Sequence, residues 1–252
     1  MEGTEIAVLM LGTCICGTLL YSRNSPLERF ELSGLLRALL MGIGVALTTL
    51  LIITSPLGRR SGAHMNPAIT LTYYWLGRIH HWDAACYMAA HFAGAAAGVL
   101  MAREILGMGL SDPPVLYLIT VPGSFGSPGA LLCEFAFASA LMGVVLCTSN
   151  HRFWSRYTPI FVALLTVFYY SVSPSIAGFS LNPARSFASA LFAWTWRGIW
   201  IYFLAPGVGM ITAATIYVRI MGPNSVYCAK VFHDLRSTCP FPCHFAHLYR
   251  RQ

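Results

Sequence analysis

Two short segments of the sequence match each other, Gly62-Ala-His-Met-Asn-Pro-Ala68 and Gly178-Phe-Ser-Leu-Asn-Pro-Ala184. Both follow the pattern G-x-x-x-N-P-A, and each leads into a short apolar stretch, over 68–76 and 184–194. Because a helix rises about 1.5 Å per residue, such a stretch covers roughly half of a hydrocarbon core about 30 Å thick. Each segment can therefore enter a membrane but cannot cross it.

The rest of the chain has the composition of a membrane protein. Of its 252 residues, 56% are apolar and only 10% are charged, whereas a soluble domain carries about 25% charged residues. The net charge of +7 does not indicate nucleic-acid binding, because the basic residues are scattered. Long apolar runs predict six membrane spans, near 4–22, 33–55, 83–106, 129–149, 157–174 and 198–220.

The two matching segments enter from opposite faces, because an odd number of spans separates them. Re-entrant backbone is tolerated only where it is buried in protein or lines a water-filled cavity. We therefore predict an all-α membrane protein with six transmembrane helices and two re-entrant half-helices, arranged as inverted halves over about 1–110 and 128–220. Residues 1–220 would form the channel domain and 221–252 a tail.

The Asn-Pro pair at each segment has a clear chemical role. Proline at the first helical position costs nothing, because the N–H groups of the first turn have no partner within the helix. The oxygen of Asn66 or Asn182 can cap the free amides, which leaves the side-chain NH2 group as a donor to a cavity. Each half-helix also presents roughly half a positive charge at its N-terminus. Such a site favours an oxygen acceptor and repels cations.

With these motifs the chain resembles the aquaporin, or major intrinsic protein, family over residues 4–220. The resemblance implies a homotetramer of passive channels for water and other small uncharged solutes, embedded in lipid, with no cofactor required for transport. It implies that both Asn-Pro-Ala triplets face the pore, namely Asn66, Pro67, Ala68, Asn182, Pro183 and Ala184. It also implies a row of backbone carbonyl acceptors from Gly62, Ala63, His64, Met65, Gly178, Ser180 and Leu181.

Four further positions should form a selectivity filter by this resemblance: Met41, Tyr170, Phe179 and Arg185. Counting without gaps gives Ala46 in place of Met41. Met41 is preferred because the stretch 54–60 is about five residues longer than is usual in the family. Glu5 and Glu134 are expected to brace the backbone of the two re-entrant loops, since an unpaired buried carboxylate is costly.

The tail departs from the family pattern. It gathers three thiols and three imidazoles that suit zinc or another soft metal, namely Cys228, His233, Cys239, Cys243, His244 and His247. A membrane-anchoring tail that carries Phe241, Phe245 and Tyr249 is the alternative. In either case the tail is expected to contribute no wall to the pore.

The basic residues of the short loops favour both termini in the cytoplasm, in a plasma membrane or a bacterial inner membrane. Ser186, Ala190 and the pair Tyr202-Phe203 match water-selective family members, whereas Phe179 matches glycerol facilitators. Water is therefore the leading substrate, and a facilitator of glycerol or another small neutral solute is the alternative. A secondary transporter is a weaker alternative, and an enzyme is disfavoured because no nucleophile lies beside a base.

Overall fold

The computed structural model describes residues 1–172, 178–233 and 239–250, and the regular secondary structure of this part of the chain is all helical, without strands. The long helices are α1 (Glu2–Tyr21), α2 (Gly34–Thr54), α5 (His81–Leu106), α7 (Gly126–Ser149), α8 (Thr158–Val172) and α11 (Ile199–Met221). The short helices are α3 (Pro56–Ser61), α4 (Pro67–Trp75), α6 (Met108–Ser111), α10 (Pro183–Ala193) and α12 (His247–Arg250). Single 3-10 turns occur at η1 (Glu28–Phe30), η2 (Leu116–Leu118) and η3 (Ser155–Tyr157).

The predicted all-α membrane fold is confirmed. Among the described residues, 5 helices are long and apolar enough to cross a membrane: α1, α2, α5, α7 and α11. The remaining predicted span corresponds to α8, which is described for 15 residues. Positions 173–174 of that span lie outside the described residues.

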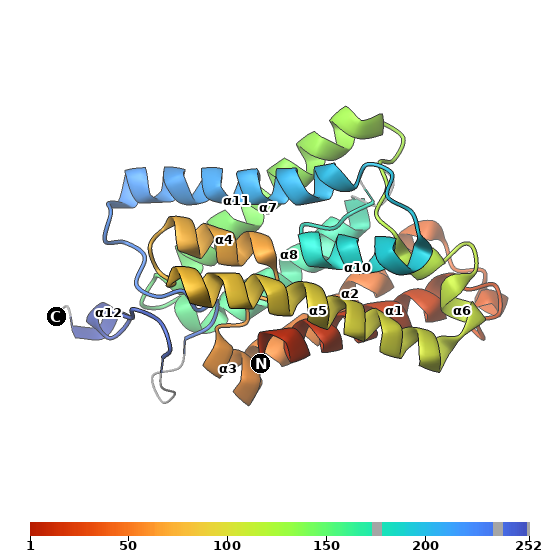
Figure 1. Cartoon of the computed structure of the whole chain (residues 1–252), viewed down its shortest axis with the longest axis horizontal. Helices are drawn as coiled ribbons and strands as arrows, with labels where there is room; N and C mark the ends of the chain where they lie inside the picture. Colours follow the sequence, from red (N-terminus) through yellow and green to blue (C-terminus); the bar gives the residue numbers. More distant parts are fainter. Residues whose placement is uncertain (173–177, 234–238, 251–252) are drawn as a thin grey trace.

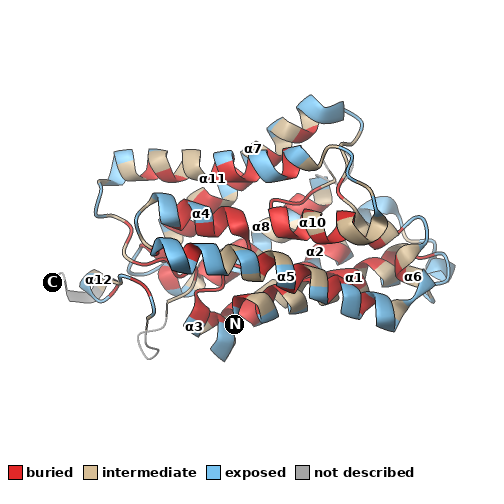
Figure 2. Cartoon of the chain, in the orientation of Figure 1, coloured by how far each residue is buried: buried red, intermediate tan, exposed pale blue. Residues whose placement is uncertain are grey.

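The two half-helices α4 and α10 lie end to end between the long helices (Figure 1). Each begins at the proline of its Asn-Pro-Ala triplet, and the preceding asparagine caps it. Buried residues gather where the two N-termini meet (Figure 2). The predicted re-entrant pair is therefore present, with both N-termini directed at the middle of the molecule.

Helix contacts repeat between the halves, since α1 packs against α5 and α7 packs against α11. Glycine allows both approaches: a Cβ atom on Gly94 of α5 would collide with the carbonyl of Gly3, and one on Gly209 of α11 would press on the carbonyl of Phe135 at 2.5 Å. Small residues at such contacts let helix backbones come close where no water drives association. Close packing at a glycine thus holds the paired long helices of each half together.

The outward faces of the long helices are apolar. Leu51 is 70% exposed, Leu132 69%, Leu164 62% and Ile220 75%. A water-facing surface rarely carries such a density of large apolar side chains, whereas lipid is a good solvent for them. The exposed surface is consistent with a chain that spans a membrane.

The long stretch before the first Asn-Pro-Ala triplet folds as the extra helix α3. The chain leaves α2 at Ser55, whose side-chain oxygen accepts a hydrogen bond from Gly58 N at 3.1 Å and caps α3. Pro56 occupies the first turn, where its missing N–H costs nothing. The extra residues are therefore absorbed at the end of α2, on the side of the molecule where the tail lies.

Candidate functional site

The two asparagines bond to each other's loops across the centre of the molecule. Asn66 Oδ1 accepts from Ala68 N at 2.9 Å, and Asn182 Oδ1 accepts from Ala184 N at 3.1 Å. Asn66 Nδ2 donates to Leu181 O, and Asn182 Nδ2 donates to Met65 O, both at 2.8 Å. Each amide nitrogen carries two hydrogens, so one remains on each asparagine for an acceptor in the cavity.

The two loops before the asparagines share one backbone conformation. In the first loop φ is +107° at Gly62, +55° at Ala63 and +49° at Met65. The second loop repeats the pattern, with +68° at Gly178, +40° at Phe179 and +54° at Leu181. Non-glycine residues adopt positive φ only at an energetic cost, so the surrounding structure must hold these loops in place. Strained backbone of this kind clusters at functional sites.

Buried carboxylates hold both loops. Glu134 accepts from Ser180 N and Leu181 N, each at 2.7 Å. In the first loop Glu2, not Glu5, accepts from His64 N at 3.0 Å and from Met65 N at 2.7 Å. The prediction for Glu5 as the carboxylate that braces the loop amides is wrong, because Glu2, the first residue of α1, accepts both of them.

Glu5 is buried all the same and its side chain faces the Ser61 hydroxyl, but neither of its carboxyl oxygens accepts a loop N–H group among the described residues. Glu2 has additional support from α5, because His91 Nε2 lies 2.7 Å from Glu2 Oε2. Both side chains of this pair are buried. Glu2 and His91 were not predicted from the sequence. Glu2 lies at the extreme N-terminus, and the sequence around His91 is typical of a helix-packing residue.

A cavity of about 130 Å³ runs past both asparagines. Its polar lining includes Asn66, Asn182, His64 and Ser180, and its walls are otherwise mostly apolar, with Val45, Val145 and Val162 among them. A few polar groups set in an apolar wall let water pass from one hydrogen-bond partner to the next without strong binding. The cavity thus has the character of a narrow pore.

Tyr170, Phe179 and Arg185 lie together on the cavity wall. The rings of Tyr170 and Phe179 meet edge to face with centroids 4.6 Å apart, and the Tyr170 hydroxyl faces the Arg185 guanidinium. Arg185 is buried, and its Nη1 atom has no hydrogen-bond partner among the described residues. The structure therefore brings three of the four predicted filter residues into contact.

The fourth filter position comes from α2. Val45 and Thr49 of α2 line the cavity, and Met41 precedes Val45 by four residues, which places it on the same helix face. Met41 is buried in one cluster with Val45, Tyr170 and Phe179. Ala46 is also buried, and it lies on the face of α2 that carries Thr49 and Ile53, which line the cavity too. The register of α2 is compatible with both positions, so Met41 stays a prediction.

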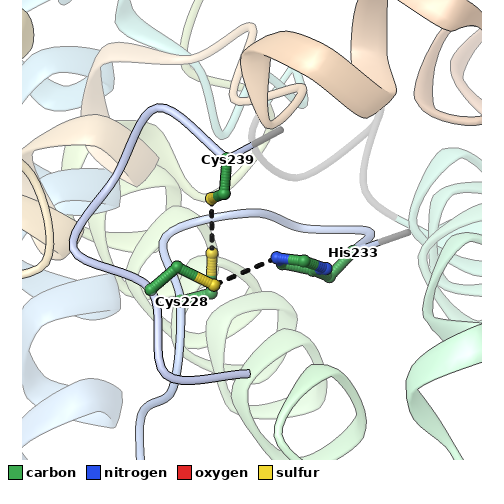
Figure 3. Close-up of side chains that lie close together, drawn as sticks. Cys228, His233 and Cys239 are labelled. Carbon is green, nitrogen blue, oxygen red and sulfur yellow. Dashed lines mark hydrogen bonds between the residues drawn. The ribbon is translucent and has the colours of Figure 1, made fainter. Parts of the chain in front are cut away.

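The tail carries a cluster of four metal-ligating side chains. The donor atoms of Cys228, His233, Cys239 and Cys243 all lie within 4.8 Å of one another. Cys228 Sγ is 3.4 Å from Cys239 Sγ, and His233 Nε2 is 3.1 Å from Cys243 Sγ. Figure 3 shows Cys228, His233 and Cys239 pointing toward one another. His244 and His247 do not join this group, so their prediction as ligands is wrong: their rings pair with each other instead, 5.6 Å apart.

The electrostatics of this cluster favour the thiolate form of Cys239 and Cys243. Hydrogen bonds from Cys228 lower the pKa of the Cys239 thiol and of the Cys243 thiol, and hydrogen bonds to the same two thiols raise the pKa of Cys228. Burial lowers the pKa of His233, but its contacts with Cys239 and Cys243 outweigh burial and raise it overall. Thiolate sulfur is the form that binds metal.

The alternative of a membrane-anchoring tail does not fit the structure. Phe241 is 7% exposed and Phe245 is 3% exposed, so neither ring is available to lipid. The Tyr249 side chain lies outside the described residues. The tail also reaches the pore, since Val231 lines the cavity. The prediction that the tail contributes no pore wall is therefore wrong.

Comparisons with known proteins agree with this geometry. A sequence profile of the family described as Major intrinsic protein matches residues 4–217. Aquaporin A from Dictyostelium discoideum is 30% identical over 224 residues, which cover 85% of this chain and 74% of the relative. Putative aquaporin NIP4-1 from Arabidopsis thaliana is 32% identical over 162 residues, which cover 64% of this chain and 55% of the relative. The chain thus spans only part of the length of these relatives.

Among solved structures, the aquaglyceroporin from Plasmodium falciparum superimposes with a TM-score of 0.72. The match covers 89% of this chain and 96% of that chain at 19% sequence identity, and so it supports the fold. The profile match extends over both Asn-Pro-Ala triplets and the long helices, except for the first residues of α1 and the last residues of α11. This chain belongs to the major intrinsic protein family.

Proposed function

We propose that this protein is a passive channel that conducts water across a membrane and excludes protons and other ions. The observation that carries the proposal is the pair Asn66 and Asn182 at the facing N-termini of α4 and α10, both on the wall of one cavity. The remaining amide hydrogens offer donors to the oxygen of a passing water molecule. The positive ends of both half-helices and the Arg185 guanidinium oppose any cation at the same place.

Water is favoured over glycerol by the filter. The contact between the Tyr170 and Phe179 rings fills part of the filter with aromatic side chains, and a polyol needs more width than a water molecule. Phe179 remains the feature that favours the alternative, a facilitator of glycerol or another small neutral solute. The relatives include both aquaporins and an aquaglyceroporin, so relatedness alone does not choose between them.

Stopped-flow light scattering on proteoliposomes separates the two substrates. A sucrose gradient should shrink vesicles that contain the protein faster than empty vesicles. A glycerol gradient should shrink them at the same rapid rate, followed by reswelling as slow as that of empty vesicles. Rapid reswelling in glycerol would contradict water selectivity and indicate a facilitator of glycerol. Saturable, ion-coupled uptake would instead indicate a secondary transporter.

The proposal extends to the oligomeric state, the orientation in the membrane and the domain bounds of the channel. The family comprises channels rather than enzymes, and transport needs no cofactor. We propose a homotetramer in lipid with both termini in the cytoplasm, a channel domain over 1–220 and a tail over 221–252. Cross-linking in native membranes tests the tetramer, and accessibility of a C-terminal epitope tests the orientation.

We also propose that the tail holds zinc or a similar soft metal ion, outside the path of water. Three cysteines and one histidine form one of the usual donor sets of structural zinc sites. The mutual distances of the four donor atoms support this proposal. Elemental analysis of protein that is purified without chelators should find about one metal ion per chain, as one closed four-ligand site implies.

A further inference from the structure

The tail segment 229–231 binds directly to the first re-entrant loop. Val231 N donates to Gly62 O at 3.0 Å, and His64 Nε2 donates to Ala229 O at 2.6 Å. Lys230, which is 1% exposed, donates from Nζ to Arg59 O. The tail therefore bonds to the backbone carbonyls of Arg59 and Gly62 and orients the ring of His64.

Phe241 adds a second contact from farther along the tail. Its ring stacks on the His64 ring with the planes 3° apart and the centroids 5.8 Å apart, and it also meets Tyr87 edge to face. Gly62 leaves room for Phe241, since a Cβ atom there would lie 3.0 Å from Phe241 Cε2. Two separate pieces of the tail thus converge on the loop that leads into α4.

Val231 lies at the end of the cavity that these contacts surround. It lines the cavity and is buried in one apolar cluster with Ile53, Val145 and Val162, which line the cavity too. An apolar side chain there supplies no hydrogen bond to replace those that a water molecule must give up. The tail therefore contributes an apolar side chain, Val231, to the wall of the pore.

The four cluster residues flank the two contacting pieces. Cys228 and His233 lie on either side of segment 229–231, and Cys239 and Cys243 lie on either side of Phe241. A tetrahedral zinc site with bonds near 2.3 Å places its sulfur ligands roughly 3.8 Å apart. The observed separations of 3.4 Å for Cys228 and Cys239 and 3.1 Å for His233 and Cys243 require only small adjustments. One ion can therefore fix both ends of both pieces at once.

We propose that a zinc ion bound by Cys228, His233, Cys239 and Cys243 holds the tail against the first re-entrant loop and keeps Val231 in the pore, so that loss of the metal opens the channel. This inference rests on the proposed water channel and on the proposed metal site. A short segment without its own core folds mainly by binding its metal. When the metal leaves, segment 229–231 keeps its hydrogen bonds to the first loop and the apolar contacts of Val231, but it loses the anchors on either side of it, and Val231 can withdraw.

The experiment compares full-length protein in liposomes before and after removal of metal with EDTA on both sides of the membrane. Water permeability should rise several-fold when zinc is removed and fall again when stoichiometric Zn²⁺ is returned. The double variant Cys239→Ser with Cys243→Ser should have the higher permeability from the start and should not respond to Zn²⁺. Cys86→Ser, an exposed thiol outside the tail, is the matched control and should behave as the parent does.

A second variant separates the effect of the Val231 side chain in the pore from the effect of zinc on the folding of the tail. Val231→Ala leaves all four ligands in place, so it should bind as much zinc as the parent and still conduct water several-fold faster with the metal bound. A metal content of zero in the parent, or a Cys228–Cys239 disulfide in its place, would overturn the metal site. Equal water permeability with and without zinc, or lower permeability after zinc is removed, would overturn the proposal that the metal closes the channel. The proposal of a water channel would be unaffected. Permeability equal to that of empty vesicles in every variant would instead contradict the water channel itself.

Discussion

At the scale of single residues, the pore depends on loops whose backbone is strained and on the carboxylates that hold them. Positive φ values at Ala63, Met65, Phe179 and Leu181 do not persist without outside support. Glu2 and Glu134 provide that support, because each accepts two backbone N–H groups in the loop that it faces. Hydrogen bonds to a charged group contribute about 1.5–3 kcal/mol each.

Replacing Glu2 should therefore destabilise the protein far more than replacing Glu5. Glu2→Gln puts an amide NH2 group against an amide donor of the loop and should cost about 2 kcal/mol, which lowers the unfolding midpoint by roughly 4–8 °C for a chain of this size. Glu5→Gln changes a carboxyl group that accepts no backbone N–H group of the loop and should leave the midpoint unchanged or raise it. Thermal unfolding in detergent tests the pair, and equal losses would restore Glu5 as a brace.

Arg185 should exclude charge rather than hold the fold. Arg185→Val removes a buried cation from the cavity wall, so proton or cation leakage through proteoliposomes should rise while water flow persists. A pH-sensitive dye inside the vesicles measures the leakage. Arg197→Val, an exposed arginine outside the pore, is the control. If Arg185→Val stays as proton-tight as the parent, the half-helix ends alone exclude protons and Arg185 selects among solutes.

Tyr170 should set the width of the filter. Tyr170→Ala removes one of the two rings that meet at 4.6 Å, so glycerol or urea should permeate several-fold faster. Phe168→Ala, on the outer face of the same helix at 54% exposure, should leave the solute profile unchanged. An unchanged profile for a folded Tyr170→Ala variant would remove Tyr170 from the filter.

At the scale of elements, the half-helices could be predicted from the sequence and their supports could not. The Asn-Pro-Ala triplets mark helix starts because a cap residue and proline act locally. Glu2 and His91 meet the first loop only through the packing of α1 against α5, and no local pattern reveals such a contact. The extra residues before the first triplet could be recognised for a similar reason, since they fold locally as α3.

In the tail, too, the composition predicts a kind of site but not its geometry. Its thiols and imidazoles indicate a soft metal, but six candidate ligands do not reveal which four converge. His233→Ala should abolish metal binding, whereas His244→Ala and His247→Ala should retain it, because only His233 lies among the thiols. Elemental analysis of the three purified variants decides between them, and loss of metal in either of the last two would return those histidines to the site.

At the scale of the whole molecule, apolar runs and the repeated motif predict the inverted bundle because both depend on short-range sequence. The docking of the tail against the pore depends on contacts between residues that are far apart along the chain, such as Val231 with Gly62. No local sequence pattern of the tail therefore indicates a role in transport. In the folded chain, tail and pore form one unit.

The osmotic water permeability of the metal-free protein in proteoliposomes, measured over a range of temperatures, tests the central claim most directly. The account predicts permeability several-fold above that of empty vesicles, with a lower activation energy than diffusion through lipid, because water crosses past Asn66 and Asn182 instead of dissolving in hydrocarbon. Permeability and activation energy equal to those of empty vesicles, for protein that is folded and inserted, would contradict the claim that the paired half-helices form a water pore.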